Sequence, residues 1–344
     1  MATEAAPISY EDLAAIEAEF QEIDTEMMRK QHAASRTAYA RRAEAVARIP
    51  NFWPLVLEQA PPEIDQHIHS HDSRVISEHL TGVSVTRVEL EEEEEGGATA
   101  GDPRSLRIRL EFSPNDVFSD EALEKTFWYR RARDGWTGLV SEPVRIHWRK
   151  GKDATEGLTD GAVALFEARE KAGDMRAKGL AEYAALGKKV EHWNGANTSF
   201  FTWFGYVSGR RYISAEESEA ATAEYRRRRD ARKHGEQVDV ETAGGSEDQD
   251  DEEAEDDQAV EVHEAGEELA VAFAEDLWPD AIKLFTQAQE MGEMSDPEFE
   301  EDDGEEDDDG SEEEVVDIRS LVQSTGKAKS RDSSGPPAAK RAKR

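Results

Sequence analysis

The 344-residue chain is predicted to be an α+β protein, in which a long N-terminal helix precedes an antiparallel β-sheet with helices packed on one face. Three observations predict this fold. The segment from Tyr10 to Arg48 contains no Pro or Gly and repeats its apolar residues at helical spacing. The middle of the chain alternates apolar and polar residues between short, turn-rich links. After Asp153 the pattern becomes helical again.

The long helix is expected over residues 10–49, after a disordered stretch at 1–9. Ser9 and Asp12 supply an N-cap and a capping-box residue at its start. Its apolar stripe repeats at heptad spacing and comprises Leu13, Ile16, Phe20, Ile23, Met27 and Ala34. About 40 residues form a helix roughly 60 Å long, which exceeds what one domain of this size covers. We therefore expect the stripe to pair with a second copy in an antiparallel homodimer. The alternative is that the helix packs along its own domain.

Four half-buried strands are expected in the middle of the chain. Their alternating apolar residues are Val83, Val85 and Leu90, then Leu106, Ile108, Leu110 and Phe112, then Phe127 and Tyr129, then Val144, Ile146 and Trp148. The links contain turn residues such as Gly96-Gly97 and Asp134-Gly135. Consecutive strands joined by short links favour an antiparallel meander.

Helices are expected on both sides of these strands, so that residues 50–290 form one α+β domain. The expected helical ranges are 50–59, 160–192, 214–233 and 266–291. Pro279 should kink the last helix or start a new one. Four aromatic rings crowd the segment Phe200–Phe204, which we interpret as a core plug that joins the sheet to its helices.

The net charge is −36, from 42 Lys and Arg against 78 Asp and Glu. Much of this excess lies in a loop at about 91–103, an internal loop at about 241–262 and a tail at 291–344. All three are predicted to be disordered, because acid runs have little to bury. Direct DNA binding is not expected, since phosphates would be repelled. A strongly basic partner is favoured instead.

Several function classes are excluded by what the sequence lacks. There is no cysteine, and no phosphate-binding loop or nucleophile elbow occurs, so we expect neither an enzyme nor a cofactor. No apolar run reaches the roughly 18 residues of a membrane helix, which predicts a soluble intracellular protein. His67, His69 and His71 could share one metal ion. They lack a clear fourth ligand, and we expect a solvated helix or turn there.

Two basic clusters stand out in this acidic chain. We interpret the C-terminal one as a nuclear localisation signal, and a generic basic end is the alternative; its residues are Lys340, Arg341, Lys343 and Arg344. The other lies on an expected helix and comprises Arg226 to Arg229, Arg232 and Lys233. It is expected to dock onto an acidic loop of the same chain, or to contact DNA or a partner.

Four motifs then appear in order: RAEAVARIPNFW from Arg42, VRIHWRKGKD from Val144, SFFTWF from Ser199 and DLWPDAIKLF from Asp276. With them the chain resembles the SET branch of the nucleosome assembly protein family over about residues 10–290. The likeness is greatest to the fungal, vacuolar-sorting-named members, and an insertion at 205–265 interrupts it.

The resemblance implies a homodimeric, nuclear, non-enzymatic histone chaperone. In that family, paired long helices carry α+β "earmuff" domains, whose acidic concave underside binds histones. The implied partners are H3–H4, also H2A–H2B, and a fungal-type histone H3 acetyltransferase. The alternative is a regulatory scaffold or cofactor of a chromatin-modifying enzyme.

Candidate histone-binding residues follow from acidity and from their position near the sheet-to-helix elements. They are Asp153, Glu156, Glu216, Glu217, Glu219, Glu264, Glu267, Glu268, Glu275 and Asp276. A folded acidic surface would select a polycation, and the acid runs would add many weak, salt-sensitive contacts.

Overall fold

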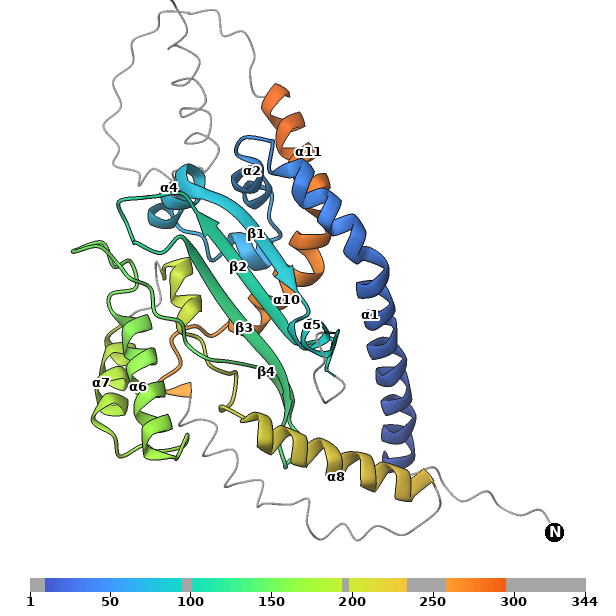
Figure 1. Ribbon diagram of the computed structural model, residues 1–344. Helices are drawn as coiled ribbons and strands as arrows, with labels where there is room; N and C mark the ends of the chain where they lie inside the picture. The colour runs from blue at the N-terminus through green and yellow to red at the C-terminus, as the bar shows by residue number, and fades with distance from the viewer. Residues whose placement is uncertain (1–9, 95–100, 194–197, 234–257, 295–344) are drawn as a thin grey trace, which may run out of the picture.

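A computed structural model describes residues 10–94, 101–193, 198–233 and 258–294 of the chain (Figure 1). Its first element is α1 (Tyr10–Val46), a rod that runs along one side of the remaining elements. The expected long helix is therefore confirmed.

A four-stranded antiparallel sheet lies at the centre, with strand order β1-β2-β3-β4. The strands are β1 (Leu80–Thr86), β2 (Leu106–Phe112), β3 (Ala122–Arg131) and β4 (Thr137–Ser141). In the register, Val83 lies opposite Leu110, and Leu106 lies opposite Phe127. The predicted meander is confirmed.

The fourth strand was predicted at the wrong place. Gly135, at φ 97°, closes the turn that follows β3, and β4 forms directly after this turn. Residues 144–148 run alongside the sheet without joining it, and only Trp148 makes a bridge, to Phe118. Their apolar side chains face the core, which gives the period-2 pattern without a strand partner. Leu90 also lies outside β1, in a short helix.

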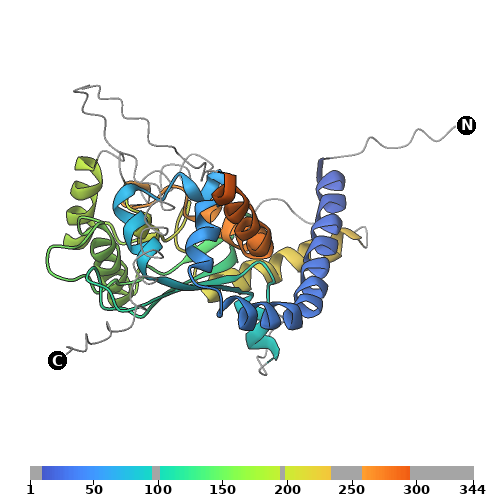
Figure 2. The same cartoon turned by 90° about the horizontal axis from the view of Figure 1, so that it is seen from above.

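One face of the sheet is covered by a helical layer, as predicted (Figure 2). The layer comprises α2 (Phe52–Glu58), α3 (Pro62–Asp65), α4 (Ser70–His79), α10 (Gly266–Ala272), η2 (Phe273–Leu277) and α11 (Trp278–Met294). Within it α11 packs on α2, α10 packs on α3, and α2 packs on β1. The opposite sheet face carries charged side chains, among them Arg109 and Glu124, which pair with each other.

The last helix passes Pro279 without ending. The π-helical turn η2 precedes this proline, so α10, η2 and α11 form one continuous helical rod. Pro279 has no backbone N–H to donate and its ring crowds the preceding turn. The wider π turn accommodates both effects. In place of the expected kink or new helix start at Pro279, the structure has a π-helical turn just before this proline.

The helix predicted over 160–192 is two helices, α6 (Leu158–Ala172) and α7 (Ala181–His192). Gly173 ends α6 in the left-handed region, at φ 70°, and the chain then turns back so that α7 packs on α6. The helix expected at 214–233 is confirmed as α8 (Ala215–Lys233).

The aromatic segment forms the 3₁₀ helix η1 (Phe200–Gly205), all of which is buried. The Trp203 ring stacks between Phe127 of β3 and Phe273 of η2, with centroid separations of 5.4 and 5.5 Å. Its indole N–H donates to the Gly266 carbonyl. The core plug between sheet and helices is confirmed.

Two expected acidic loops are partly ordered. Residues 91–94 belong to α5 (Val88–Glu94), where Glu89 pairs with Arg130 at 2.9 Å and so fixes the helix to β3. At the end of the second loop, Val260 and Val262 are buried against α6 and α7. Residues 101–103 are also described, and the first four residues of the predicted tail, 291–294, belong to the last helix. Positions 1–9, 95–100, 241–257 and 295–344 of the predicted disordered segments lie outside the described residues.

Candidate functional site

Half of the predicted histone-binding acids lie on or beside the helical rod of α10 and η2. Glu264 lies two residues before α10, and Glu268 and Asp276 are exposed along the rod. Val271 is 41% exposed between them. The rod therefore presents carboxylates around an apolar side chain.

Two other acids of this group are engaged within the domain. Glu275 pairs with Arg87, which follows β1. Burial raises the pKa of Glu267, and the backbone N–H of Leu139 in β4 opposes that shift. Glu267 is thus directed toward the sheet and is less available to a partner than predicted.

Of the predicted acids at the start of α8, one is paired within the domain and two are exposed. Glu217 accepts two hydrogen bonds from the Arg211 guanidinium, at 2.6 and 3.1 Å, and these bonds lower its pKa. Glu216 and Glu219 are exposed. Only the latter two present unengaged charge at this end of α8, as far as the described residues show.

Asp153 and Glu156 precede α6. The Asp153 carboxylate accepts hydrogen bonds from the backbone N–H and the hydroxyl of Thr155, at 2.8 and 2.7 Å, so it shapes the turn. Glu156 is exposed, in the left-handed region at φ 53°. The predicted acids therefore occupy three separate elements, and no ion pair or hydrogen bond among the described residues joins one group to another.

The predicted dimerisation stripe lies open on α1. Its large residues are each between 51% and 59% exposed, and they are Leu13, Ile16, Phe20, Ile23 and Met27. Ala34 is exposed as well. Other positions of α1 contact its own domain: Ala18 is buried, and the Arg42 guanidinium bonds the Trp278 carbonyl. The alternative that the stripe packs along its own domain is therefore wrong.

The two halves of α1 carry opposite charge. Residues 10–28 contain seven acids and no Lys or Arg, whereas residues 29–46 contain five bases and one acid. Antiparallel pairing of two such helices would place each acidic half beside a basic half. Parallel pairing would place like charges together.

α8 connects the sheet to the acidic half of α1 (Figure 1). Near its start, the Ser218 hydroxyl accepts a hydrogen bond from the backbone N–H of Arg131 at 3.0 Å. Near its end, Arg229 forms an ion pair with Glu22 of α1. The basic patch thus docks partly onto the long helix rather than onto an acidic loop, while Arg226 and Arg227 stay exposed.

The histidine cluster lies where the start of α4 contacts the start of η1. His69 and His71 flank the start of α4, where the buried Asp72 accepts hydrogen bonds from the Ser199 hydroxyl at 2.6 Å and the Phe200 N–H at 2.8 Å. Burial raises the pKa of Asp72, and these bonds oppose the shift. No group of three metal-binding side chains occurs within the described ranges. The segment is a helix start, but its Asp72 is buried rather than solvated as expected.

Two charged side chains inside the domain, Lys125 and Glu261, went unpredicted. The ammonium group of Lys125 donates to the carbonyls of Glu142, Phe204 and Tyr206 at 2.9–3.1 Å. The Glu261 carboxylate accepts four backbone N–H bonds, from Val207, Ser208, Val262 and His263. Burial lowers the pKa of Lys125 and raises that of Glu261, each to about 7. Both ends of the 205–265 insertion are thereby fixed to the domain.

Comparison with known proteins identifies the fold's relatives. The family model described as "Nucleosome assembly protein (NAP)" matches residues 4–288, which is most of the chain. The chain belongs to the nucleosome assembly protein family. The family expected from the four motifs is thus confirmed.

Individual relatives match a smaller part of this chain than the family model does. A Schizosaccharomyces pombe protein provisionally named a nucleosome assembly protein is 34% identical over 42% of this chain and 59% of its own length. NAP1-related protein 2 of Arabidopsis thaliana is 25% identical over 56% of this chain and 58% of its own length. The chain thus spans about three fifths of these relatives.

Among solved structures, Ccp1 aligns with a TM-score of 0.47 at 23% identity, covering 85% of this chain and 98% of its own. The Vps75 histone chaperone aligns at 0.46 and 20%, covering 81% and 97%. No helix in the described part of this family member is long and apolar enough to cross a membrane.

Proposed function

We propose that this family member is a histone chaperone that acts in nucleosome assembly, binding H3–H4 and also H2A–H2B. The observation that carries the proposal is a set of exposed carboxylates for which the described residues show no basic partner. They are Glu156, Glu216, Glu219, Glu264, Glu268 and Asp276. Histones are polycations, so fixed acids on a folded surface supply the complementary charge.

The rod of α10 and η2 is proposed as the first contact surface. It combines Glu264, Glu268 and Asp276 with the exposed Val271, so that ionic contacts surround one apolar contact. Protein interfaces commonly combine a central apolar contact with a polar rim. The many acids outside the described residues would add weak contacts that DNA displaces by its own charge density.

Binding measurements with matched variants test this surface. Fluorescent H3–H4 and H2A–H2B are titrated with the full chain, with Glu264→Gln/Glu268→Gln, and with Glu182→Gln/Glu191→Gln as control. The control removes equal charge from exposed positions of α7. We expect the α10 variant to bind about fivefold or more weakly than the control, roughly 1 kcal/mol.

Equal loss in both variants would refute a localised surface. Absence of histone binding by the unaltered chain would refute the chaperone function. Stoichiometric recovery of a chromatin-modifying enzyme without histone would then favour the scaffold alternative.

We also propose that the chain is an antiparallel homodimer. The exposed stripe on α1 and its two oppositely charged halves support this arrangement. Because the chain has no cysteine, a single Leu13→Cys label reports the orientation. Antiparallel helices predict a label separation above about 30 Å by electron spin resonance, given a rise of about 1.5 Å per residue. A separation below about 20 Å would show parallel pairing.

Nuclear import and an acetyltransferase partner complete the proposal. The basic end, Lys340, Arg341, Lys343 and Arg344, lies outside the described residues, and its charge and the preceding Pro residues support an import signal. Replacing these four residues with Ala in a fluorescent fusion should shift it to the cytoplasm. Copurification of a histone H3 acetyltransferase with the full chain tests the other partner.

A further inference from the structure

The apolar stripe lies on the part of α1 that extends beyond the attachments of its C-terminal half. Arg42 bonds the Trp278 carbonyl, and Arg29 bonds the Gly101 carbonyl in the loop before β2. Leu13 lies about 24 Å of helix beyond Arg29. Long helices curve with radii of roughly 60–100 Å, and such a bend would move Leu13 by about 3–5 Å. The position of the stripe relative to the domain therefore depends on what supports this half of α1.

The helix α8 reaches α1 at this half (Figure 1). Arg229 of α8 forms an ion pair with Glu22, and the Arg229 side chain is only 19% exposed. Ala18 lies one helical turn before Glu22 on the same face of α1 and is buried. The stripe itself remains exposed. α8 thus contacts α1 and leaves the stripe free for a second copy.

The charges of the two helices are complementary over more than this one ion pair. Residues 226–233 of α8 contain six bases and one acid, whereas residues 10–28 of α1 contain seven acids and no Lys or Arg. A single ion pair at a partly exposed site contributes little. Two segments of opposite charge attract each other as a whole, so the basic end of α8 is directed to the acidic half of α1.

The beginning of α8 is fixed to the sheet. Ile213, two residues before the helix, is buried against Val140 of β4. The Ser218 hydroxyl accepts the hydrogen bond from the backbone N–H of Arg131, and the Arg131 guanidinium lies 4.1 Å from the centre of the Tyr225 ring. Two turns of α8 are thereby attached to the end of β3.

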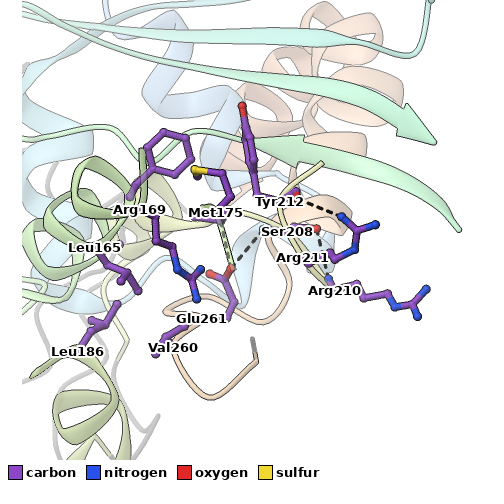
Figure 3. Close-up of a pocket in the computed structure, with 13 residues that line it drawn as sticks. Leu165, Arg169, Met175, Leu186, Ser208, Arg210, Arg211, Tyr212, Val260 and Glu261 are labelled. Atoms are coloured by element: carbon purple, nitrogen blue, oxygen red, sulfur yellow. Dashed lines mark hydrogen bonds between the residues drawn. The ribbon is translucent and has the colours of Figure 1, made fainter. Parts of the chain in front are cut away.

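The segment that leads into α8 is held by one buried carboxylate (Figure 3). Glu261 accepts hydrogen bonds from the N–H groups of Val207 and Ser208, at 3.1 and 3.3 Å, at one end of the insertion. At the other end it accepts those of Val262 and His263, at 2.9 and 3.2 Å. Both ends of the insertion therefore meet at Glu261, and α8 starts from a fixed base.

We propose that α8 is a rigid spacer between the sheet and α1, which fixes the angle between each domain and its long helix and so sets the separation of the two domains in the dimer. This inference rests on the homodimer proposed above. The carboxylates of α10 and η2 belong to these domains, so the spacer also sets the span of the proposed histone surface.

Electron spin resonance on the full chain tests the proposal. A single Ile282→Cys label, at a position 56% exposed on α11, gives one distance between the two domains of a dimer, because the chain has no native cysteine. The distance distribution should be narrow in the parent. Glu22→Arg places like charge beside Arg229 and should widen it about twofold or more, since each released half helix moves by about 3–5 Å. The charge exchange Glu22→Arg/Arg229→Glu should restore the narrow distribution.

Glu17→Arg makes the same charge change at another exposed position of α1 and should leave the distribution narrow. The proposal is overturned by a Glu22→Arg distribution as narrow as the parent's, by equal widening in Glu17→Arg, or by a charge exchange that restores nothing. Light scattering accompanies each sample. A parent of monomeric mass would refute the homodimer and this proposal together, while the histone titration reports on the chaperone function separately.

Discussion

The guanidinium of Arg42 lies 4.0 Å from the centre of the Trp278 ring and bonds the backbone carbonyl of the same residue. The Tyr39 ring meets Trp278 with a centroid separation of 5.4 Å. The basic half of α1 is thereby fixed to the start of α11. Its acidic half, with the apolar stripe, extends toward α8, whose Arg229 pairs with Glu22. The long helix is thus attached to the domain near both of its ends.

Replacing Arg42 tests the first attachment. Arg42→Ala removes a buried cation from two aromatic rings and a carbonyl, and we expect a loss of about 2 kcal/mol in unfolding free energy. The neighbouring Arg41→Ala, at an exposed position, should change stability by less than about 0.5 kcal/mol. Chemical denaturation measures both. Equal effects of the two variants would contradict the attachment.

Replacing the apolar stripe tests dimerisation. Ile16→Glu/Ile23→Glu buries charge in the proposed interface and should yield a monomer of 38.4 kDa by light scattering. Gln21→Glu/Ala33→Glu adds equal charge at exposed positions off the stripe and should remain at twice that mass. A stripe variant that stays dimeric would show that the interface lies elsewhere.

Lys125 tests how the insertion is anchored. Lys125→Met leaves three buried carbonyls without a donor and Glu261 without a nearby cation, and we expect a loss of about 3 kcal/mol. The exposed Lys152, which pairs with Asp116 at 3.3 Å, gives the matched control Lys152→Met. A Lys125→Met variant as stable as the parent would show that the buried ammonium group contributes little.

His263 predicts a pH effect. Burial lowers the pKa of His263 to about 3. The centroid of its ring lies 5.0 Å from that of His67, and burial lowers the pKa of His67 as well. The unfolded chain therefore binds this proton below about pH 6.5, whereas the folded chain does not until about pH 3. Stability from this group falls as pH decreases through that window, by up to about 1.4 kcal/mol per pH unit.

The comparison with His263→Phe isolates this effect from the other titrating groups. The parent's stability relative to the variant should decline steadily between pH 6.5 and 4 in urea unfolding. A pH-independent difference between parent and His263→Phe would contradict the assignment.

The sequence predicted those elements whose signals are local. The apolar stripe of α1, the turn at Gly135 and the aromatic density of η1 each required only neighbouring residues. The fourth strand failed because Val144, Ile146 and Trp148 alternate while packing on the core without a strand partner. Gly173, which divides the helix predicted at 160–192, was an available signal for a helix end.

The candidate site depended more on tertiary contacts. Glu217 and Glu275 carry the same charge as their exposed neighbours, and only their ion pairs distinguish them. Arg211 lies six residues from Glu217, whereas Arg87 lies 188 residues from Glu275. Lys125 had a local signal, since it lies between Leu123 and Phe127 on the inward face of β3. Its carbonyl partners come from residues 142, 204 and 206, which periodicity cannot place.

The histone-chaperone function is tested most directly by native mass spectrometry of the full chain mixed with H3–H4 at about 0.15 M salt. We predict a complex that contains two copies of this chain and histone, and that is weakened in Glu264→Gln/Glu268→Gln but not in Glu182→Gln/Glu191→Gln. Free histone beside an unliganded chain under these conditions would contradict the proposed function.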